Sequence, residues 1–324
     1  MAKFKVYYTI ELNEVATHIF ESNDFEVKLC SHNDEETYVK ELAEFQPDAI
    51  MCRTEPITAK MMDTCKNLKV IGKQGAGLDN IDMDHAHAKD ITVVYAPAGN
   101  ANAVAEHAVM LMLMCAKRFT YVDRQFRGGN FLVRMGMEHT YELGGKTLGM
   151  IGCGRISQLA MQKCKYGFGM KVIGYDPYLT QDKIGDLCEL KATAKEVWEQ
   201  ADFVSVHLPV VPSTEHSIGR EQFSWMKPTA SFINCARGAL IKENELVECL
   251  KDGTLFQAGL DVFEHEPIQE SSRALFDLDN VIMTPHMAAT TEQSVLNCCT
   301  SVANDIVAVC NGQEPKVKAQ KPKF

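Results

Sequence analysis

Residues 147–157, TLGMIGCGRIS, combine an apolar run with a glycine-rich turn. The run at 148–151 is typical of a buried strand, and a helical stretch opens directly after Gly152-Cys153-Gly154. The first glycine permits a tight turn, and the second lets a ligand approach the backbone. The free N–H groups of Arg155 and Ile156 at the start of the helix can then bind phosphate. The stretch therefore predicts a strand–turn–helix unit that binds a dinucleotide.

The next strand-like run indicates which dinucleotide is bound. It covers residues 172–175 and is followed by Asp176, 22 residues beyond Gly154. A carboxylate there accepts hydrogen bonds from both ribose hydroxyls and repels a 2′-phosphate, which favours NAD over NADP. Asp176 also precedes Pro177 and is typical of a turn, and the two interpretations are compatible. Ser157 stands at the third position of the glycine fingerprint, where a small residue packs the helix on the strand.

Short strand-like runs, separated by amphipathic stretches, extend in both directions from this unit. They cover residues 5–8, 25–27, 49–51, 70–71, 93–94, 148–151, 171–174, 203–206, 231–234, 257–260 and 281–283. Strands that alternate with helices form right-handed crossovers and a parallel sheet. The expected fold class is therefore α/β, with two doubly wound parallel-sheet domains.

A break at residues 96–100, APAGN, separates the two domains. Residues 99–289 are predicted to form a Rossmann domain that binds NAD. Residues 1–98 and 290–324 are predicted to form a discontinuous, flavodoxin-like domain that binds the substrate. The active site is expected in the cleft between the domains, whose closure would exclude water.

Three further segments carry structural predictions. Asn102 is a candidate N-cap for a buried helix at 103–117, whose apolar residues surround the helix axis. The polar, glycine-bearing segment at 120–145 is interpreted as an excursion from the body of its domain. The last helix, at about 291–309, has no following strand and is expected to pack on the first domain.

Composition and charge exclude several classes of protein. The formal net charge of -10 argues against a nucleic-acid partner, which requires a basic face. The longest apolar run, at 108–116, is far shorter than the ~20 residues that span a bilayer, so no membrane association is expected. The 12 cysteines include no CxxC pair and no cluster with zinc spacing, so neither a metal site nor a disulfide framework is predicted. Without a recognisable signal peptide, the chain is expected in the cytoplasm, with reduced thiols.

Three charged side chains follow successive late strands. Arg237 lies after the run at 231–234, Glu266 after that at 257–260, and His286 after that at 281–283. Ligands of open parallel sheets bind beyond the carboxyl ends of the strands, so these residues are predicted to converge on one crevice. Each of them taken singly is also compatible with a solvated surface residue.

These segments resemble the D-2-hydroxyacid dehydrogenase family, which includes phosphoglycerate, glyoxylate/hydroxypyruvate and D-lactate-type enzymes. The similarity extends over most of the chain, and its motifs are specific as an ordered set rather than singly. They are GAGLDNID (75–82), AVAE (103–106), the glycine fingerprint, HLP (207–209), NCARG (234–238), DVF (261–263) and TPH (284–286).

The resemblance implies a role for each of the three charged residues. Arg237 would hold the substrate carboxylate and polarise the C2 carbonyl, as its planar, permanently charged fork suits. His286 would protonate the carbonyl oxygen as hydride arrives and would take the proton back in oxidation. Glu266 would hydrogen-bond His286, fix its tautomer and favour its charged form. These three are the predicted catalytic residues.

The resemblance also implies binding roles at the ends of other strands. The backbone around Ala76, Gly77 and Leu78 would cradle the substrate carboxylate. Arg53 would contact the distal group of the substrate or simply pair with a carboxylate. The predicted NAD contacts, besides those given above, are with His207, Pro209, Cys235 and Asp261, the last two orienting the nicotinamide amide. Three histidines lie in helical patterns and are interpreted as packed or exposed residues only; these are His85, His87 and His107.

The function expected from this resemblance is NAD-dependent hydride transfer at C2 of a small 2-hydroxy or 2-keto acid. A hydroxypyruvate- or glyoxylate-like substrate is favoured, because a phosphorylated one requires more cations than Arg53 and Lys73. Oxidation of 3-phosphoglycerate and reduction of a longer 2-keto acid remain alternatives, and Met287 beside His286 departs from the family pattern. An alternative of another class is an NAD-sensing corepressor or scaffold resembling C-terminal-binding proteins. This alternative is disfavoured because nothing in the sequence resembles an added interaction tail. The segment at 120–145 predicts a homodimer, as in family members.

Overall fold

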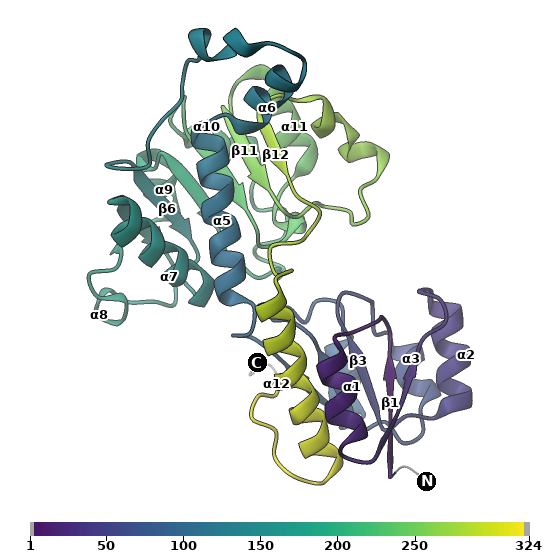
Figure 1. The fold of residues 1–324 in the computed structure, drawn as a ribbon. Coiled ribbons are helices and arrows are strands. Elements are labelled where there is room, and N and C mark those ends of the chain that lie inside the picture. The colour runs from purple at the N-terminus through teal and green to yellow at the C-terminus, as the bar shows by residue number, and fades with distance from the viewer. Residues whose placement is uncertain (1–2, 321–324) are drawn as a thin grey trace. The chain divides into compact units, whose positions relative to one another are not determined.

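The computed structural model describes residues 3–320, which divide into two compact units. One unit combines residues 3–100 with 290–320, and the other contains residues 101–289 (Figure 1). The remaining residues of the predicted first domain, 1–2 and 321–324, lie outside the described part of the chain. Each unit has an all-parallel sheet covered by helices on both faces, so the predicted α/β class is confirmed.

The first unit is built on a five-stranded sheet in the order β2-β1-β3-β4-β5. Its strands are β1 (Phe4–Tyr8), β2 (Phe25–Leu29), β3 (Ala49–Cys52), β4 (Val70–Lys73) and β5 (Thr92–Tyr95). Helices α1 (Glu14–Glu21) and α12 (Glu292–Cys310) cover one face, and α2 (Glu35–Phe45), α3 (Ala59–Thr64) and α4 (Met83–Ala88) cover the other. Because strand side chains alternate, Val6 and Tyr8 join the first core and Tyr7 joins the second.

The C-terminal helix α12 packs directly on β4. A Cβ atom at Gly72 would lie 2.4 Å from Cδ1 of Ile306 and 2.7 Å from Cγ1 of Val302, so a larger residue would force the helix away. In addition, α1 and α12 lie side by side on this face of the sheet (Figure 1). The last helix therefore belongs to the unit that the N-terminal strands form.

The second unit is built on a seven-stranded sheet in the order β12-β11-β10-β9-β6-β7-β8. Its strands are β6 (Thr147–Ile151), β7 (Lys171–Tyr175), β8 (Glu189–Leu190), β9 (Phe203–Val206), β10 (Ser231–Asn234), β11 (Gln257–Leu260) and β12 (Val281–Met283). Helices α5 (Ala101–Ala116) and α7 (Arg155–Gln162) pack on one face, and α9 (Ala194–Gln200), α10 (Arg220–Trp225) and α11 (Glu243–Asp252) pack on the other. The strand order reverses between β6 and β9, the position where such sheets bind nucleotides.

The structure confirms the predicted strands and corrects two details. The two-residue edge strand β8 was not predicted. The prediction that Asn102 caps the following helix was wrong, because α5 already begins at Ala101 and Asn102 lies in its first turn. There its amide Nδ2 donates to Oε1 of Glu106 at 2.9 Å, one turn further along the helix. The helix is buried on most sides, as its apolar pattern predicted.

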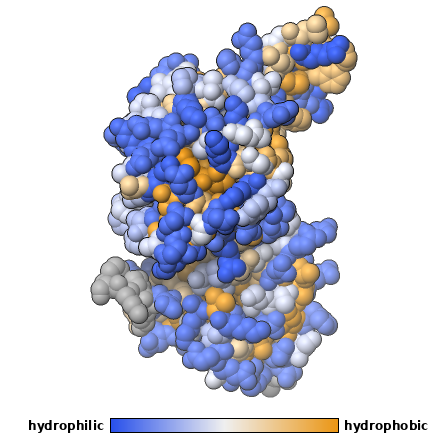
Figure 2. Space-filling model, turned by 90° about the vertical axis from the view of Figure 1, so that its left-hand side faces the viewer, coloured by the Kyte–Doolittle hydropathy of each residue, from blue (hydrophilic) through white to orange (hydrophobic). Residues whose placement is uncertain are grey.

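The segment predicted at 120–145 begins one residue earlier, with α6 (Phe119–Arg127), and continues with a 3-10 helix, η1 (Phe131–Gly136). Neither element has a buried residue. Large apolar side chains are instead exposed along the segment, namely Phe119, Phe126, Phe131, Leu132 and Met135. Figure 2 shows apolar side chains gathered on the projecting part at the top of the view, where this segment lies in Figure 1. Within residues 3–320, no helix is long and apolar enough to cross a membrane.

Candidate active site

The glycine-rich turn after β6 has the geometry of a phosphate site. Gly152 adopts φ +87°, and a Cβ there would lie 2.5 Å from the carbonyl oxygen of His207, so this position requires glycine. Gly154 is the N-cap of α7, and no side chain caps that helix. A Cβ at Gly154 would meet nothing within 4 Å. The first-turn N–H groups, those of Arg155 and Ile156 included, therefore have no side-chain cap, and the open space at Gly154 leaves room for a pyrophosphate.

Ser157 strengthens this turn. Its buried hydroxyl donates to the carbonyl oxygen of Gly152 at 2.6 Å, and so ties the first turn of α7 to the end of β6. The small side chain fits between helix and strand, where the fingerprint usually has a third glycine. This departure from the fingerprint is therefore compatible with a dinucleotide site.

Asp176 lies beside the same turn. Its Oδ2 accepts from the N–H of Cys153 at 2.9 Å, and its Oδ1 accepts from the N–H of Tyr178 at 2.9 Å. The carboxylate thus makes the Asp-Pro turn and reaches the glycine loop at once. Each oxygen keeps a lone pair for a further donor, as the ribose hydroxyls of NAD require. The residues present fit NAD.

His207 and Pro209 follow β9 next to the strand reversal. The Nε2 atom of His207 lies 2.9 Å from the hydroxyl of Ser205. Burial lowers the pKa of His207 to about 4, so the imidazole is neutral at physiological pH. Pro209 is exposed at the surface of the same loop. A neutral ring beside the glycine turn does not add charge to the site.

Arg237 is held by the turn that ends β10. The amide of Asn234 accepts from the N–H of Ala236 at 2.9 Å and donates to the carbonyl oxygen of Arg237 at 2.9 Å. The Arg237 guanidinium donates through Nη1 to the carbonyl oxygen of Ala236 at 2.7 Å. Cys235, predicted to contact the nicotinamide, is buried within this turn. The side chain of Asn234 therefore fixes the backbone from which Arg237 projects.

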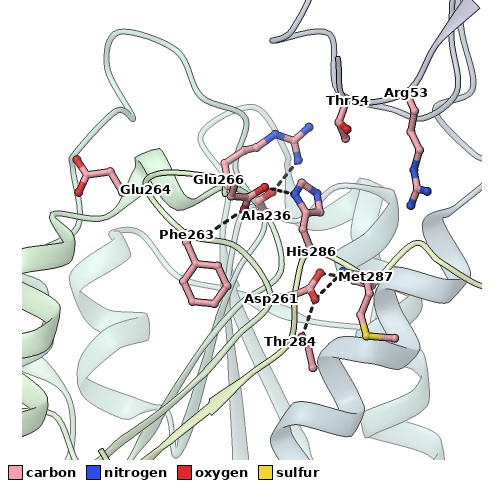
Figure 3. A network of polar contacts seen from close by, with 12 residues as sticks. Arg53, Thr54, Ala236, Asp261, Phe263, Glu264, Glu266, Thr284, His286 and Met287 are labelled. Carbon is pink, nitrogen blue, oxygen red and sulfur yellow. Dashed lines mark hydrogen bonds and ion pairs between the residues drawn. The ribbon is translucent and has the colours of Figure 1, made fainter. Parts of the chain in front are cut away.

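Glu266 and His286 form a short hydrogen-bonded pair. Nδ1 of His286 lies 2.5 Å from Oε2 of Glu266, while Oε1 of Glu266 accepts from the N–H of Phe263 at 3.0 Å (Figure 3). Partial burial raises the pKa of Glu266, but the hydrogen bond and charge of His286, the Phe263 N–H and the charge of Arg237 outweigh it. The pKa of Glu266 is therefore held below its ordinary value, and the carboxylate stays ionised opposite the imidazole.

Two contacts hold the loop that carries Glu266 in place. A Cβ at Gly238 would lie 1.9 Å from the carbonyl carbon and oxygen of Phe263, so the two backbones touch. The buried carboxylate of Glu243, the first residue of α11, accepts from the N–H of Glu264 at 2.9 Å. These contacts bring Glu266 to the same end of the sheet as Arg237. Sequence reasoning missed Glu243, because nothing in a helical pattern marks a carboxylate that caps a distant loop.

His286 follows β12 in a strained backbone conformation, with φ +49°. Its N–H donates to the carbonyl oxygen of Asp261 at 2.8 Å, and its ring is 37% exposed, so a substrate can reach it. Asp261, predicted to orient the nicotinamide amide, is fully buried. Its carboxylate accepts from the N–H group of Met287 at 2.9 Å (Figure 3) and from that of Ala288 at 2.9 Å. Asp261 thus holds the loop of His286 in place.

The predicted substrate residues lie in the first unit. Arg53 directly follows β3, and Ala76 and Gly77 follow the neighbouring strand β4, so both loops occupy the carboxyl edge of that sheet. Nη2 of Arg53 donates to the hydroxyl of Thr290 at 2.9 Å. The buried Lys73 donates to the carbonyl oxygen of Arg53 and so supports the loop from beneath.

Comparison with known proteins agrees with this geometry. The model of the NAD-binding domain of the D-isomer specific 2-hydroxyacid dehydrogenases matches residues 109–288. The chain belongs to this family. It is 39% identical over 311 residues to D-3-phosphoglycerate dehydrogenase of Methanocaldococcus jannaschii, covering 95% of this chain and 58% of that relative. It is 37% identical over 296 residues to hydroxypyruvate reductase of Thermotoga maritima, covering 91% of this chain and 94% of that relative.

A solved structure of a 2-keto acid reductase is similar to almost the whole of this chain. A glyoxylate reductase from Paecilomyes thermophila superimposes with a TM-score of 0.88 at 25% identity, and the match covers 98% of this chain and 99% of that one. The match covers only 58% of the length of the D-3-phosphoglycerate dehydrogenases of Methanocaldococcus jannaschii and Archaeoglobus fulgidus. The second unit of this chain contains the residues that match the NAD-binding domain of this family, and NAD is the cofactor.

Proposed function

We propose that this protein is an NAD-dependent oxidoreductase that transfers hydride at C2 of a small 2-hydroxy or 2-keto acid. The observation that carries the proposal is the Glu266–His286 pair, 2.5 Å apart, with the charge of Arg237 beside it. A carboxylate-bound imidazole is a proton donor and acceptor, and a neighbouring guanidinium binds a carboxylate. This combination suits a 2-keto acid, which presents a carboxylate next to a carbonyl.

Each of the three side chains has a distinct task in this reaction. When bound, NADH supplies the hydride. Arg237 binds the substrate carboxylate and polarises the C2 carbonyl. Glu266 accepts a hydrogen bond from Nδ1–H of His286, which leaves Nε2 to protonate the carbonyl oxygen in reduction and to take the proton back in oxidation. Glu266 remains ionised throughout because its pKa is lowered.

The two units divide the binding work in this proposal. The N–H groups of Arg155 and Ile156 beyond Gly152 and Gly154 bind the pyrophosphate, Asp176 binds the adenosine ribose, and His207 and Pro209 line the adenosine side. The backbone at Cys235 orients the nicotinamide amide, while Asp261, being buried, acts through the His286 loop. Arg53 and the backbone of Ala76 and Gly77 contact the substrate.

A hydroxypyruvate- or glyoxylate-like substrate is favoured over a phosphorylated one. Lys73, the second cation near Arg53, is buried and donates to a backbone carbonyl, which leaves Arg53 as the cation of this loop. The relatives named hydroxypyruvate reductase and glyoxylate reductase match this preference. Oxidation of 3-phosphoglycerate is the second candidate, because the relative at 39% identity is named for that substrate.

The substrate is tested by measuring NADH consumption with glyoxylate, hydroxypyruvate, pyruvate, branched 2-keto acids and phosphohydroxypyruvate. We expect the highest kcat/KM with hydroxypyruvate or glyoxylate. A kcat/KM that is at least tenfold higher with phosphohydroxypyruvate would establish the phosphoglycerate alternative instead. Tight NADH binding without turnover on any of these acids would contradict the enzymatic proposal and favour an NAD sensor.

The protein is further proposed to be a homodimer in the cytoplasm. Neither α6 nor η1 has a buried residue, their large apolar side chains are exposed, and burial of such a patch favours self-association. The free thiols favour a reducing compartment. Light scattering of the purified chain is expected to give twice its mass of 36.1 kDa, whereas a monomer at micromolar concentration would contradict the dimer.

A further inference from the structure

A second histidine, His107, lies behind the loop of His286. It projects from the buried helix α5, and only 10% of its side chain is exposed. Its Nε2 atom lies 2.8 Å from the hydroxyl of Thr284 and 3.4 Å from Oδ1 of Asp261. Thr284 follows β12 and Asp261 follows β11, so His107 joins the helix layer to the ends of both strands. None of the binding or proton-transfer steps above uses His107.

The direction of each hydrogen bond in this chain of groups follows from the donors available. The Asp261 carboxylate accepts from two backbone N–H groups, so it acts as an acceptor toward Thr284 as well. The Thr284 hydroxyl donates its only hydrogen to Oδ1 of Asp261, which lies 2.6 Å away. Toward His107, Thr284 can then only accept, which requires a hydrogen on Nε2 of His107. Burial lowers the pKa of His107, although the charge of Asp261 opposes the shift, so the ring is neutral with its proton on Nε2.

Asp261 connects these hydrogen bonds to the loop that carries His286. Its backbone carbonyl accepts from the N–H of His286 at 2.8 Å, and its two carboxylate oxygens accept from the N–H groups of Met287 and Ala288. His286 lies between these anchors at φ +49°, a conformation that costs about 1–3 kcal/mol and persists only where the surroundings enforce it. The carboxylate can enforce it only in one orientation, because both of its oxygens are engaged.

We propose that His107 is a positioning residue for His286. By donating to Thr284, it orients the hydroxyl that holds the Asp261 carboxylate, and the carboxylate in turn holds residues 286–288 so that Nδ1 of His286 meets Glu266. This inference rests on the proposed role of His286 as the proton donor. It assigns a function to a histidine that the helical pattern marked only as packed or exposed.

The test compares variants that remove one link with variants that keep it. His107→Leu removes the donor, and His107→Gln retains an N–H donor near the position of Nε2. Thr284→Val removes the hydroxyl, and Thr284→Ser retains it. The first readout is amide hydrogen exchange in the cofactor-free chain, measured by mass spectrometry on peptides that resolve Met287 and Ala288. We expect exchange at these amides to accelerate at least tenfold in His107→Leu and Thr284→Val, and to stay within threefold of wild type in the other two variants.

Steady-state kinetics give the second readout. In His107→Leu and Thr284→Val, kcat is expected to fall about 10- to 100-fold while KM for NADH changes less than twofold, because the loop and not the cofactor site is altered. The double variant is expected to lose no more than the worse single variant, since both break the same chain. A double variant whose loss of kcat equals the product of the two single losses would overturn the proposal. An increase in KM for NADH with kcat unchanged would overturn it as well.

The two readouts separate this inference from the proposed function. Unchanged exchange at Met287 and Ala288 would refute the positioning role whatever the turnover. Accelerated exchange in His107→Leu and Thr284→Val, with no turnover of any acid by the wild type, would leave the positioning role standing and refute the enzymatic function. If His107→Leu fails to fold, Thr284→Val gives the same reading, because it replaces a hydroxyl by a methyl group of similar size.

Discussion

Replacing His286 by alanine is expected to lower kcat for NADH-dependent reduction about 1,000-fold, with little change in the affinity for NADH. A positioned general acid contributes about 100- to 10,000-fold to such a rate. The imidazole is 37% exposed and makes its short contact with Glu266 through Nδ1, so its loss removes the proton donor without opening a cavity in the core. Steady-state kinetics with the preferred 2-keto acid, and fluorescence titration with NADH, measure the two quantities.

The matched control is His18→Ala, which removes an exposed histidine from α1 in the other unit. This variant is expected to keep the wild-type kcat. A His286→Ala enzyme that retains more than a tenth of the wild-type kcat would show that another group protonates the substrate. That result would rule out the assigned role of the Glu266–His286 pair.

Replacing Gly238 by alanine is expected to have the second largest effect. The added Cβ would lie 1.9 Å from the backbone of Phe263, far inside van der Waals contact, and neither partner is a flexible side chain. The loop at 263–266 must therefore move, and Glu266 must move with it. We expect kcat to fall at least 100-fold and the free energy of unfolding to fall by about 3 kcal/mol, as for other overpacked sites. Kinetics and denaturant unfolding provide these values.

Gly167→Ala is the control for this substitution, because a Cβ at that glycine meets nothing within 4 Å. It is expected to leave both kcat and stability near wild type. If the free energy of unfolding of Gly238→Ala falls while kcat is unchanged, the contact with Phe263 stabilises the fold without positioning Glu266. The argument for a clamped catalytic loop would then be wrong.

The strands were predictable from the sequence because parallel strands are buried on both faces and therefore appear as short apolar runs. The edge strand β8 escaped prediction because it has two residues and begins with the exposed Glu189. Asn102 was misassigned because its side chain favours N-caps in general, whereas the turn at 97–100 ends two residues before it and Ala101 already starts the helix. Local preference located the helix but not its first residue.

The site was predictable to the extent that strand ends mark it. Arg237, Glu266 and His286 each lie in the loop that follows a strand, and topology alone brings such positions to one edge of a sheet. His107 and Glu243 act from helices, and their partners lie far away in the sequence, 177 residues for the contact of His107 with Thr284. A helical pattern states that a residue is on a helix and not what its side chain touches. The buried Asp261 shows the same limit, since its position after β11 gives no sign that its carboxylate is saturated by the His286 loop.

Direct hydride transfer to C2 of the substrate is the central claim, and isotope transfer tests it directly. The enzyme is incubated with hydroxypyruvate and NADH that carries deuterium at both C4 positions, and the glycerate formed is analysed by mass spectrometry and NMR. The account predicts one deuterium per molecule of product, located at C2. Glycerate without deuterium at C2, formed while the labelled NADH is consumed, would contradict it.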